Sequence, residues 1–596
     1  MDRQATIGFI LIGVVIFAWM LLQAPSTPPP PQGGALQDSV QALRPADADR
    51  PVVPAPLPPP ASPADTLGRF FAARTAGKEQ VITVRTDLYT AELTTRGALV
   101  RKWELAGYKT WNGFPVHLVD MDGGGDFSLL FNTADGKQIN TRGLSWTCDR
   151  AGWSTLELRG TDSASVDFVL SLEGNRAIVK RYTFRNGEHG FTAEVRFANM
   201  QDVLSNFEYR ILWETGTRYA EANSVDESGY ALGYASLGGE VTEIDATPDA
   251  PALADMDGAT DWVATRNKYF AVAMIPEKGA SSGVELAGQA IPQPDRGLRE
   301  VYALGLKVPY RGQAEERTRV RVFLGPLDLE IVRSLGVGLD KIMSLGAAWI
   351  IRPIAEYVMM PLLTFLHLFI PNWGVVILVF SVLIKVALHP LTKTQMTSMR
   401  KMQALSPMMN EIREKYKDDP EKMNQQVLNL YRDYGVNPAS GCLPLLMQLP
   451  ILYALFVVFR SAIELRQAPF TAWITDLSIP DEVIHLPFSI PLFGIASISG
   501  LALAMGVTMF IQQKMTVTDP RQKAMVWMMP ILMTLMFTTL PSGLNLYYFT
   551  FNLLSIVQQY YVNRSHKDEP LRKVDPKKRS GGIMERIARD LPKMKR

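Results

Sequence analysis

The chain has 596 residues, of which 47% are hydrophobic and 20% charged, and its 61 basic and 59 acidic residues give a net charge of +2. This length is too great for one compact core, and the apolar content is too high for a disordered polymer. The near-neutral charge excludes a uniformly basic nucleic-acid-binding protein. Apolar windows of membrane length at the N-terminus and after about residue 350, with a soluble composition between them, predict a membrane protein with a large aqueous domain.

Residues 1–23 are predicted to form an N-terminal transmembrane anchor. They contain the apolar run Ile7–Leu22, which approaches the length needed to cross the hydrocarbon, and no small-residue cleavage site follows it cleanly. We therefore expect an uncleaved anchor rather than a cleaved signal peptide. Residues 24–63 hold 13 of the chain's 40 prolines. Such a segment cannot bury a core, and polyproline stiffness makes it an extended linker.

Residues 64–340 have the two-residue period of β-strands. Apolar residues alternate with polar ones over 191–197, and the turn-forming cluster 185–190 separates this run from a second one at 177–184. The same alternation recurs at Val81–Thr86 and Ser165–Leu172. Many short strands joined by turns rich in Gly and Asn predict a large antiparallel β-sandwich domain.

After residue 340 the pattern becomes helical. Segment 341–371 mixes Arg352, Glu356 and His367 with apolar residues, which is typical of an amphipathic helix lying in the membrane interface rather than crossing it. Five apolar segments follow and predict five further spans, so that the anchor makes six in all: 372–391, 441–462, 490–514, 523–540 and 542–562. The third of these is long enough to tilt or to include a loop.

The charges of the loops orient these spans. Segment 392–440 carries eight basic residues, and the tail 563–596 carries 12 basic and 5 acidic residues. The loop 463–489 instead has one arginine against four acidic residues. Positively charged loops stay inside, so we expect both termini in the cytoplasm and the β domain outside it. Cys148 and Cys442 would then lie in different compartments, which predicts two structural thiols and no disulfide.

Within the cytoplasmic segment, residues 392–437 are predicted to form a helical hairpin that breaks at Asp418-Asp419-Pro420. Met396, Met399, Met402 and Leu405 give its first helix one apolar side. A solvated two-helix hairpin and a contact surface for a nascent chain both fit this pattern.

Lys385 is the most unusual residue of the predicted spans. It lies eleven residues after Gly374, so the rise of the helix places its ammonium roughly 16 Å into the bilayer, where a lysine costs about 2.5–3.5 kcal/mol. Ser381, four residues earlier, lies on the same helix face. A lysine that extends toward the cytoplasmic interface past His389 is the alternative.

The last predicted span weighs against that alternative, because five polar residues form one stripe along it. They occur at offsets 0, 3, 7, 10 and 14: Asn545, Tyr548, Asn552, Ser555 and Gln559. Gln448, Thr508 and Gln512 add polar groups on other spans. Single members of this set are explained by hydrogen bonds between helices. Together with a lysine and no acidic residue in the five spans, they predict a hydrated, positively charged cavity.

A stripe of methionines occupies one face of segment 523–540, at offsets 0, 3, 4, 8 and 11: Met525, Met528, Met529, Met533 and Met536. Unbranched thioether side chains repack around different partners, so this face suits varied apolar segments. Packing against neighbouring helices is the other interpretation. Elsewhere the six histidines show no H-E-x-x-H, and no C-x-x-C, P-loop or G-x-S-x-G occurs, so we predict no metal, no cofactor and no enzymatic activity.

An ordered set of short motifs across residues 349–562 closely resembles the bacterial YidC family of membrane-protein insertases. The motifs are Asn372-Trp373-Gly374, Pro390-Leu391-Thr392-Lys393, Val436-Asn437-Pro438, Gly441-Cys442-Leu443-Pro444-Leu445-Leu446, Glu464-Leu465-Arg466-Gln467-Ala468-Pro469-Phe470, Gly506-Val507-Thr508-Met509 and Pro541-Ser542-Gly543-Leu544-Asn545-Leu546-Tyr547-Tyr548. The preceding anchor and β domain are similar to the family form that carries a periplasmic β-supersandwich.

This resemblance implies a protein of the bacterial inner membrane, with residues 24–371 in the periplasm. It implies an insertase that moves short polar segments of nascent membrane proteins through a hydrophilic groove and releases apolar spans into the lipid bilayer, alone or with the Sec translocon. The groove positions carried over by motif are Lys385, Ser381, Gln448, Tyr548, Asn552 and Ser555. Most members have arginine at the position of Lys385; lysine keeps the charge and loses the planar fork that grips a carboxylate. Segment 490–505 is longer than in familiar members.

Other functions remain open on the residues alone. A secondary transporter also places polar groups at mid-membrane, although the five clustered spans show no internal duplication. A membrane-tethered sugar-binding module is a second alternative for the β domain. The basic tail suits salt-sensitive contact with the RNA of a ribosome, without sequence preference, or attraction to anionic lipid.

Overall fold

A computed structural model of the protein describes residues 63–119, 123–150, 155–347, 349–436, 443–490, 495–516, 523–565 and 573. The chain divides into two compact units, Met1–Gly325 and Pro326–Arg596, so the division falls earlier than the boundary at residue 340 expected from composition. The predicted anchor, the linker up to Ser62, and most of the basic tail lie outside the described residues.

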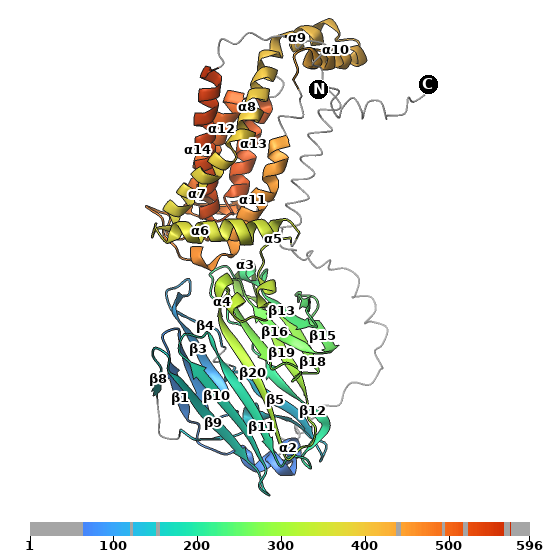
Figure 1. The fold of residues 1–596 in the computed structure, drawn as a ribbon, viewed down its shortest axis with the longest axis vertical. Helices are drawn as coiled ribbons and strands as arrows, with labels where there is room; N and C mark the ends of the chain where they lie inside the picture. Colours follow the sequence, from blue (N-terminus) through green and yellow to red (C-terminus); the bar gives the residue numbers. More distant parts are fainter. Residues whose placement is uncertain are drawn as a thin grey trace, which may run out of the picture. The chain divides into compact units, whose positions relative to one another are not determined.

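The first unit consists mainly of β-strands (Figure 1). Its strands are β1 (Val81–Arg85), β2 (Tyr89–Thr94), β3 (Leu99–Lys109), β4 (Pro115–His117), β5 (Ser128–Thr133), β6 (Gln138–Asn140), β7 (Thr147–Cys148), β8 (Thr155–Glu157), β9 (Ser163–Ser171), β10 (Ala177–Arg185), β11 (Gly190–Ala198), β12 (Leu204–Trp213), β13 (Leu232–Leu237), β14 (Glu240–Ile244), β15 (Ala252–Asp257), β16 (Thr260–Arg266), β17 (Phe270–Pro276), β18 (Gly283–Gln293), β19 (Gly297–Pro309) and β20 (Glu315–Pro326). Its short helices are α2 (Pro63–Phe71), η1 (Ala72–Arg74), η2 (Thr141–Gly143), α3 (Ser224–Ser228) and η3 (Pro294–Arg296).

These strands form three sheets. The orders are β4-β3-β2-β1-β8, β14-β13-β16-β17-β20-β11-β10-β9-β7 and β15-β18-β19-β12-β5-β6. The predicted β-rich domain is thus confirmed, and the strands expected at 81–86, 165–172, 177–184 and 191–197 are β1, β9, β10 and β11. One pair departs from the expected antiparallel pattern, because β1 and β8 run parallel.

The β10–β11 hairpin shows how the alternation of residues produces this fold. Ile178 on β10 pairs with Phe197 on β11, and both side chains are buried, whereas Arg181 on β10 and Arg196 on β11 are more exposed. Gly190 ends the turn with φ 143°, and a Cβ there would lie 2.0 Å from the carbonyl oxygen of Val322 on the next strand. Glycine is therefore required where β11 meets β20.

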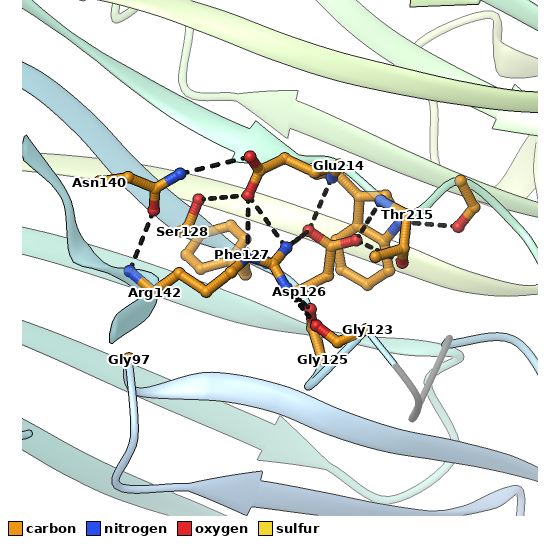
Figure 2. Close-up of polar contacts among 12 residues, drawn as sticks. Gly97, Gly123, Gly125, Asp126, Phe127, Ser128, Asn140, Arg142, Glu214 and Thr215 are labelled. Atoms are coloured by element: carbon orange, nitrogen blue, oxygen red, sulfur yellow. Dashed lines mark hydrogen bonds and ion pairs between the residues drawn. The ribbon is translucent and has the colours of Figure 1, made fainter. Parts of the chain in front are cut away.

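A buried polar cluster lies within the first unit (Figure 2). The Asp126 carboxylate accepts hydrogen bonds from the backbone N–H groups of Glu214 and Thr215, each at 2.7 Å, and from the Thr215 hydroxyl at 2.6 Å. Arg142 lies between the two acids, with Nη2 at 3.5 Å from Asp126 and 2.9 Å from Glu214. Burial raises the pKa of the Asp126 carboxyl to about 6, although these hydrogen bonds and the charge of Arg142 act in the opposite direction.

Lys180 on β10 is a buried cation near this cluster. It is fully buried, and its ammonium donates to the carbonyl oxygens of Phe127 at 2.7 Å, Gly97 at 3.0 Å and Ala98 at 3.3 Å. All three of its donors are therefore used. Burial lowers the pKa of Lys180 well below its usual value, and Arg142 acts in the same direction.

The second unit is mostly helical (Figure 1). Its elements are α4 (Leu329–Ser334), η4 (Leu339–Ile342), α5 (Ile351–Ile354), the π-helical turn η5 (Ala355–Met359), α6 (Met360–His367), α7 (Trp373–Ala387), α8 (His389–Ala404), α9 (Ser406–Lys415), α10 (Pro420–Asp433), α11 (Leu443–Ser461), η7 (Ile463–Leu465), β21 (Glu482–Ile490), β22 (Ile495–Ser499), α12 (Gly500–Thr516), α13 (Lys523–Phe537) and α14 (Ser542–Ser565). Among the described residues, no helix combines the length and the hydropathy needed to cross a membrane.

The segment α5–η5–α6 runs crosswise at one end of the helical bundle (Figure 1). Ion pairs fix its polar side: Arg352 contacts Glu356 at 2.9 Å and Asp340 at 3.0 Å, and Arg333 also pairs with Glu356. Its other side leaves a row of large apolar residues exposed: Tyr357, Val358, Phe365, Leu368 and Phe369. Ion pairs and exposed apolar side chains thus occupy different sides of this segment.

Two predicted spans of this unit have bounds that differ from those of the helices in the structure. Helix α7 ends at Ala387 rather than 391, because α8 begins at His389 with Pro390 in its first turn. The span predicted at 490–514 begins with strand structure, and α12 starts only at Gly500. The Ser499 hydroxyl accepts a hydrogen bond from the N–H of Ala502 at 3.0 Å, so this serine caps the helix and sets its start.

Helices α9 and α10 form the antiparallel pair seen at one end of the second unit (Figure 1). Helix α10 begins at Pro420, where the Asp419 side chain accepts a hydrogen bond from the N–H of Lys422 at 3.1 Å. The hydroxyl of Tyr431 on α10 lies 2.9 Å from the sulfur of Met409 on α9. An aspartate cap followed by proline in the first turn explains why the helical pattern breaks here.

Candidate functional site

The candidate site begins with α7, which carries both Ser381 and Lys385. Asn372 starts this helix, since its side-chain oxygen accepts a hydrogen bond from the N–H of Val375 at 3.1 Å. Both site residues are buried on the face that packs against α14; Lys385 is 7% exposed and Ser381 is fully covered. Neighbouring Val386 is 65% exposed, so adjacent positions of one helix have opposite environments.

The Lys385 ammonium contacts two groups of α14. It donates a hydrogen bond of 2.7 Å to the Ser555 hydroxyl, and it lies 4.4 Å from the centre of the Phe551 ring. The Ser555 hydroxyl donates in turn to the carbonyl oxygen of Phe551 at 2.8 Å. Within the described residues, no carboxylate lies within 4.0 Å of Lys385 and its other two donors have no partner. This is a buried cation held by one hydroxyl and one aromatic face.

The predicted stripe of α14 divides into two parts. Ser555 meets Lys385, and Asn552 lies half-buried one turn before it. Tyr548 is also half-buried and packs edge-on against Phe537 of α13, with ring centres 5.1 Å apart. Asn545 is fully buried and donates to the carbonyl oxygen of Phe537 at 3.0 Å, so it connects α14 to the end of α13 rather than to Lys385.

The remaining predicted groove residues are not joined to Lys385 by contacts. Ser381 lies one turn from it, but its hydroxyl bonds to the carbonyl oxygen of Ile377 in its own helix at 2.7 Å. Gln448 on α11 is half-buried, and the described residues show no hydrogen bond to its side chain. The structure therefore brings Lys385 and Ser555 into direct contact, and the roles of the other positions stay predictions.

A polar link that the sequence interpretation missed joins α8 to α14. The Gln558 side chain contacts Thr392 Oγ1 at 3.2 Å and His389 Nδ1 at 3.2 Å. Gln558 lies one turn after Ser555, but it falls off the predicted stripe, which continues through Gln559. The sequence signal for this link was Thr392 in the 390–393 motif, because a threonine near a helix start can form a hydrogen bond to a neighbouring helix.

Helix α13 exposes only part of its methionine face. Met528 is 57% exposed, whereas Met529, Met533 and Met536 are half-buried, and the side chain of Met525 lies outside the described residues. Trp527 and Ile531 are exposed beside Met528. On its other side α13 approaches α12 closely: a Cβ at Gly506 would lie 2.0 Å from the Thr534 hydroxyl. The exposed apolar face is therefore centred on Met528.

Two family models match this chain. The 60Kd inner membrane protein model matches residues 365–569, and the YidC periplasmic domain model matches residues 81–357. The membrane protein insertase YidC of Chlorobaculum parvum is 39% identical, over 96% of this chain and 96% of its own length. The chain belongs to the YidC family of membrane protein insertases. The YidC of Chlorobaculum tepidum is 37% identical, again over 96% of both chains.

Membership of this family confirms the resemblance seen in the motifs, and it places the chain among proteins of the bacterial inner membrane. The relatives support the insertase interpretation and not the transporter or the sugar-binding module. A solved structure, an active YidC insertase with its first transmembrane domain resolved, is 20% identical with a TM-score of 0.35. It covers 82% of this chain and 93% of that chain.

Proposed function

We propose that this protein inserts membrane proteins by offering their short polar segments a cation-bearing groove between α7 and α14. The observation that carries the proposal is the Lys385 ammonium, which is buried, has one hydrogen bond from three donors and contacts no carboxylate among the described residues. Buried charges are normally paired, because an unpaired one is costly. A buried cation without a carboxylate partner among the described residues suits an acidic or polar segment of a nascent chain.

The mechanism lowers the barrier to crossing and involves no covalent step. A polar segment that enters the groove avoids bare hydrocarbon, which saves several kcal/mol for each polar or charged group. Lys385 attracts acidic residues of that segment, and Ser381, Gln448, Tyr548, Asn552 and Ser555 supply polar contacts. No ATP site is needed, since burial of the client's apolar span provides about 0.8 kcal/mol per CH₂ group.

The client's apolar span leaves along α13 in this proposal. Exposed Met528, with Trp527 and Ile531 beside it, forms an apolar surface that a hydrophobic segment can follow into lipid. This proposed apolar surface also includes the other methionines of the stripe: Met525, Met529, Met533 and Met536. Thioether side chains change conformation readily, so one surface can accept clients of different sequence.

We further propose a six-span arrangement for the chain in the inner membrane. The anchor 1–23 provides one span, and α7, α11, α12, α13 and α14 provide the others. Loop charge supports cytoplasmic termini, a periplasmic β domain and a cytoplasmic α9–α10 hairpin. The hairpin and the basic tail would meet the ribosome that supplies the nascent chain, and the Sec translocon would be a partner for larger clients.

Site-specific photocrosslinking to stalled nascent chains tests this function. Photoreactive residues at Ser381 and Asn552 should crosslink the polar segment of a client, and one at Met528 should crosslink its apolar span. Val386 on the opposite, exposed face of α7 is the matched control and should give no crosslink to the polar segment. Equal crosslinking of the polar segment from Val386 and Asn552 would contradict a groove between α7 and α14.

A further inference from the structure

The β21–β22 hairpin leaves large apolar side chains uncovered. Val483, Ile484 and Phe488 of β21 are 41%, 48% and 62% exposed. The two strands pair only with each other, through Glu482↔Ser499, Ile484↔Ile498 and His485↔Ser497, within the described residues. A single two-stranded hairpin is marginally stable in water. An uncovered apolar hairpin of this kind calls for a surface that covers it.

Hydrogen bonds hold the base of the hairpin in place, so a loosely held base does not explain the exposure of its apolar side chains. Asp481 accepts hydrogen bonds from Trp473 Nε1 at 3.0 Å, from the N–H of Leu501 at 2.8 Å, and from the Ser499 hydroxyl. Asn545 of α14 lies 3.4 Å from that hydroxyl. One buried carboxylate thus ties both ends of the hairpin to the start of α12.

The hairpin lies at the same end of the helical unit as the amphipathic segment. The loop before β21 joins the first residues of two helices: Asn372 of α7 donates to the carbonyl oxygen of Phe470 at 3.2 Å, and Ser542 of α14 donates to that of Asp476 at 2.7 Å. His367 at the end of α6 stacks on Trp373 of α7, with ring centres 3.9 Å apart. The exposed apolar rows of α6 and β21 therefore belong to one end of the bundle.

The length of α12 indicates what covers the hairpin. Its 17 residues span about 25 Å, which is several ångströms less than a hydrocarbon core of about 30 Å. The apolar residues that extend the run before Gly500 are those of the hairpin. Its sheet edges have backbone groups that need water or polar lipid, so it cannot lie deep in hydrocarbon. Its polar residues Glu482 and His485 contact each other, with His485 Nε2 at 3.1 Å from a Glu482 carboxylate oxygen. These features together suit the boundary between acyl chains and headgroups.

We propose that the β21–β22 hairpin is a membrane-interface anchor that inserts Ile484 and Phe488 into the periplasmic leaflet beside α6. The half-exposed Trp473 at its base is a residue type favoured at that depth. This inference about the hairpin rests on the proposed function, in which α7, α12 and α14 cross the bilayer. The anchor fixes the level of the bundle in the membrane at the end where α12 begins.

Depth-dependent fluorescence quenching tests this anchor in the full chain. An environment-sensitive dye is attached at Phe488→Cys, in a protein that also carries Cys148→Ser and Cys442→Ser, and the protein is reconstituted in phosphatidylethanolamine–phosphatidylglycerol vesicles. A fraction of the lipid is brominated either near the headgroup or near the methyl end of the chains. We expect headgroup-proximal bromine to quench this dye about twofold more than it quenches one at Asp249→Cys, an exposed site of the β unit.

A dye at Val386→Cys, the exposed position of α7 next to Lys385, separates the two ideas. Quenching at Val386 by methyl-end bromine, without lipid quenching at Phe488, would overturn the anchor and leave the spans intact. No lipid quenching at Val386 would overturn the proposed spans themselves. Quenching by iodide in the water gives the last distinction. A dye at Phe488→Cys that iodide quenches and brominated lipid does not quench is exposed to solvent. A dye that neither iodide nor bromine quenches is covered by protein. Either result overturns the anchor.

Discussion

Two buried lysines, one in each unit, differ in how completely their charge is satisfied. Lys180 in the β unit donates to three carbonyl oxygens at 2.7–3.3 Å and lies near a cluster in which Arg142 meets Asp126 and Glu214. Lys385 in the helical unit has one hydroxyl partner and one aromatic face. Both side chains are buried, so burial alone does not distinguish a structural cation from a functional one. We distinguish the two lysines by how many N–H donors of each ammonium lack an acceptor among the described residues.

This difference has an energetic meaning. The cluster around Lys180 contains two cations and two carboxylates, and backbone groups from the loops that border β3, β5 and β12 hold its members. A satisfied buried network makes the fold specific and rigid. Lys385 has no such balance among the described residues, and this is why we propose that it meets an anionic or polar segment of a client. We regard the first lysine as part of the scaffold and the second as part of the binding site.

The largest expected effect comes from Lys180→Met. The change leaves the carbonyl oxygens of Gly97 and Phe127 without this donor in a buried site, which should cost about 2–5 kcal/mol of stability in the β unit. Hydrogen exchange of the β10 amides in the full-length protein would show this as faster opening. Lys385→Met is the matched control, and equal loss of protection in its own helix would contradict the distinction between the two lysines.

Asp126→Asn should have a smaller effect on the same unit. An amide group in place of the carboxylate turns an NH₂ toward backbone N–H donors of Glu214 or Thr215, so that at least one donor loses its acceptor. We expect a loss of about 1–3 kcal/mol, seen as faster exchange in β12. Insertion of clients by the folded fraction should be unchanged. A loss of insertion with normal exchange protection would contradict this prediction and show that Asp126 acts in insertion rather than in stabilising the β unit.

Ser555→Ala should have the smallest effect, and it acts on the binding site. It removes the one hydrogen bond that the Lys385 ammonium makes within the described part of the chain, so the ammonium becomes freer to meet a client carboxylate. We expect insertion of clients with acidic tails to change by less than about fivefold, since a hydrogen bond to a charged group contributes roughly 1.5–3 kcal/mol and the client can replace it. Thr550→Ala, which removes a hydroxyl bonded within α14, is the control. A loss as large as that caused by removing Lys385 would make Ser555 a principal contact.

The strands of the β unit could be predicted from sequence because one face of each is buried. The alternation at 177–184 and 191–197 corresponds to β10 and β11, whose side chains alternate between core and surface. The β21–β22 hairpin could not be predicted in this way. The sequence from Ile490 to Ser499 is mostly apolar and continues into the apolar residues of α12, and such a run does not distinguish a strand from a buried helix.

The candidate site was predicted only in part for a similar reason. Helical spacing placed Ser381 with Lys385 on one helix and grouped the α14 residues, because both patterns are local. Which stripe member meets the lysine depends on how α7 packs against α14, and spacing cannot supply that. Ser555 is the one that does, whereas Asn545 turns to the end of α13. The role of Gln558 could not be predicted from helical spacing, because its partners, Thr392 and His389, lie on another helix.

The charge preference of insertion tests the central claim most directly. Purified protein and its Lys385→Leu and Lys385→Arg variants would be reconstituted in vesicles, and the insertion rates of two clients that differ only in an acidic or a neutral translocated tail would be compared. We predict that Lys385→Leu slows the acidic client about tenfold more than the neutral one, equivalent to roughly 1.4 kcal/mol, and that Lys385→Arg retains the preference. Equal rates for the two clients with native protein, or an equal loss for both in Lys385→Leu, would contradict the account.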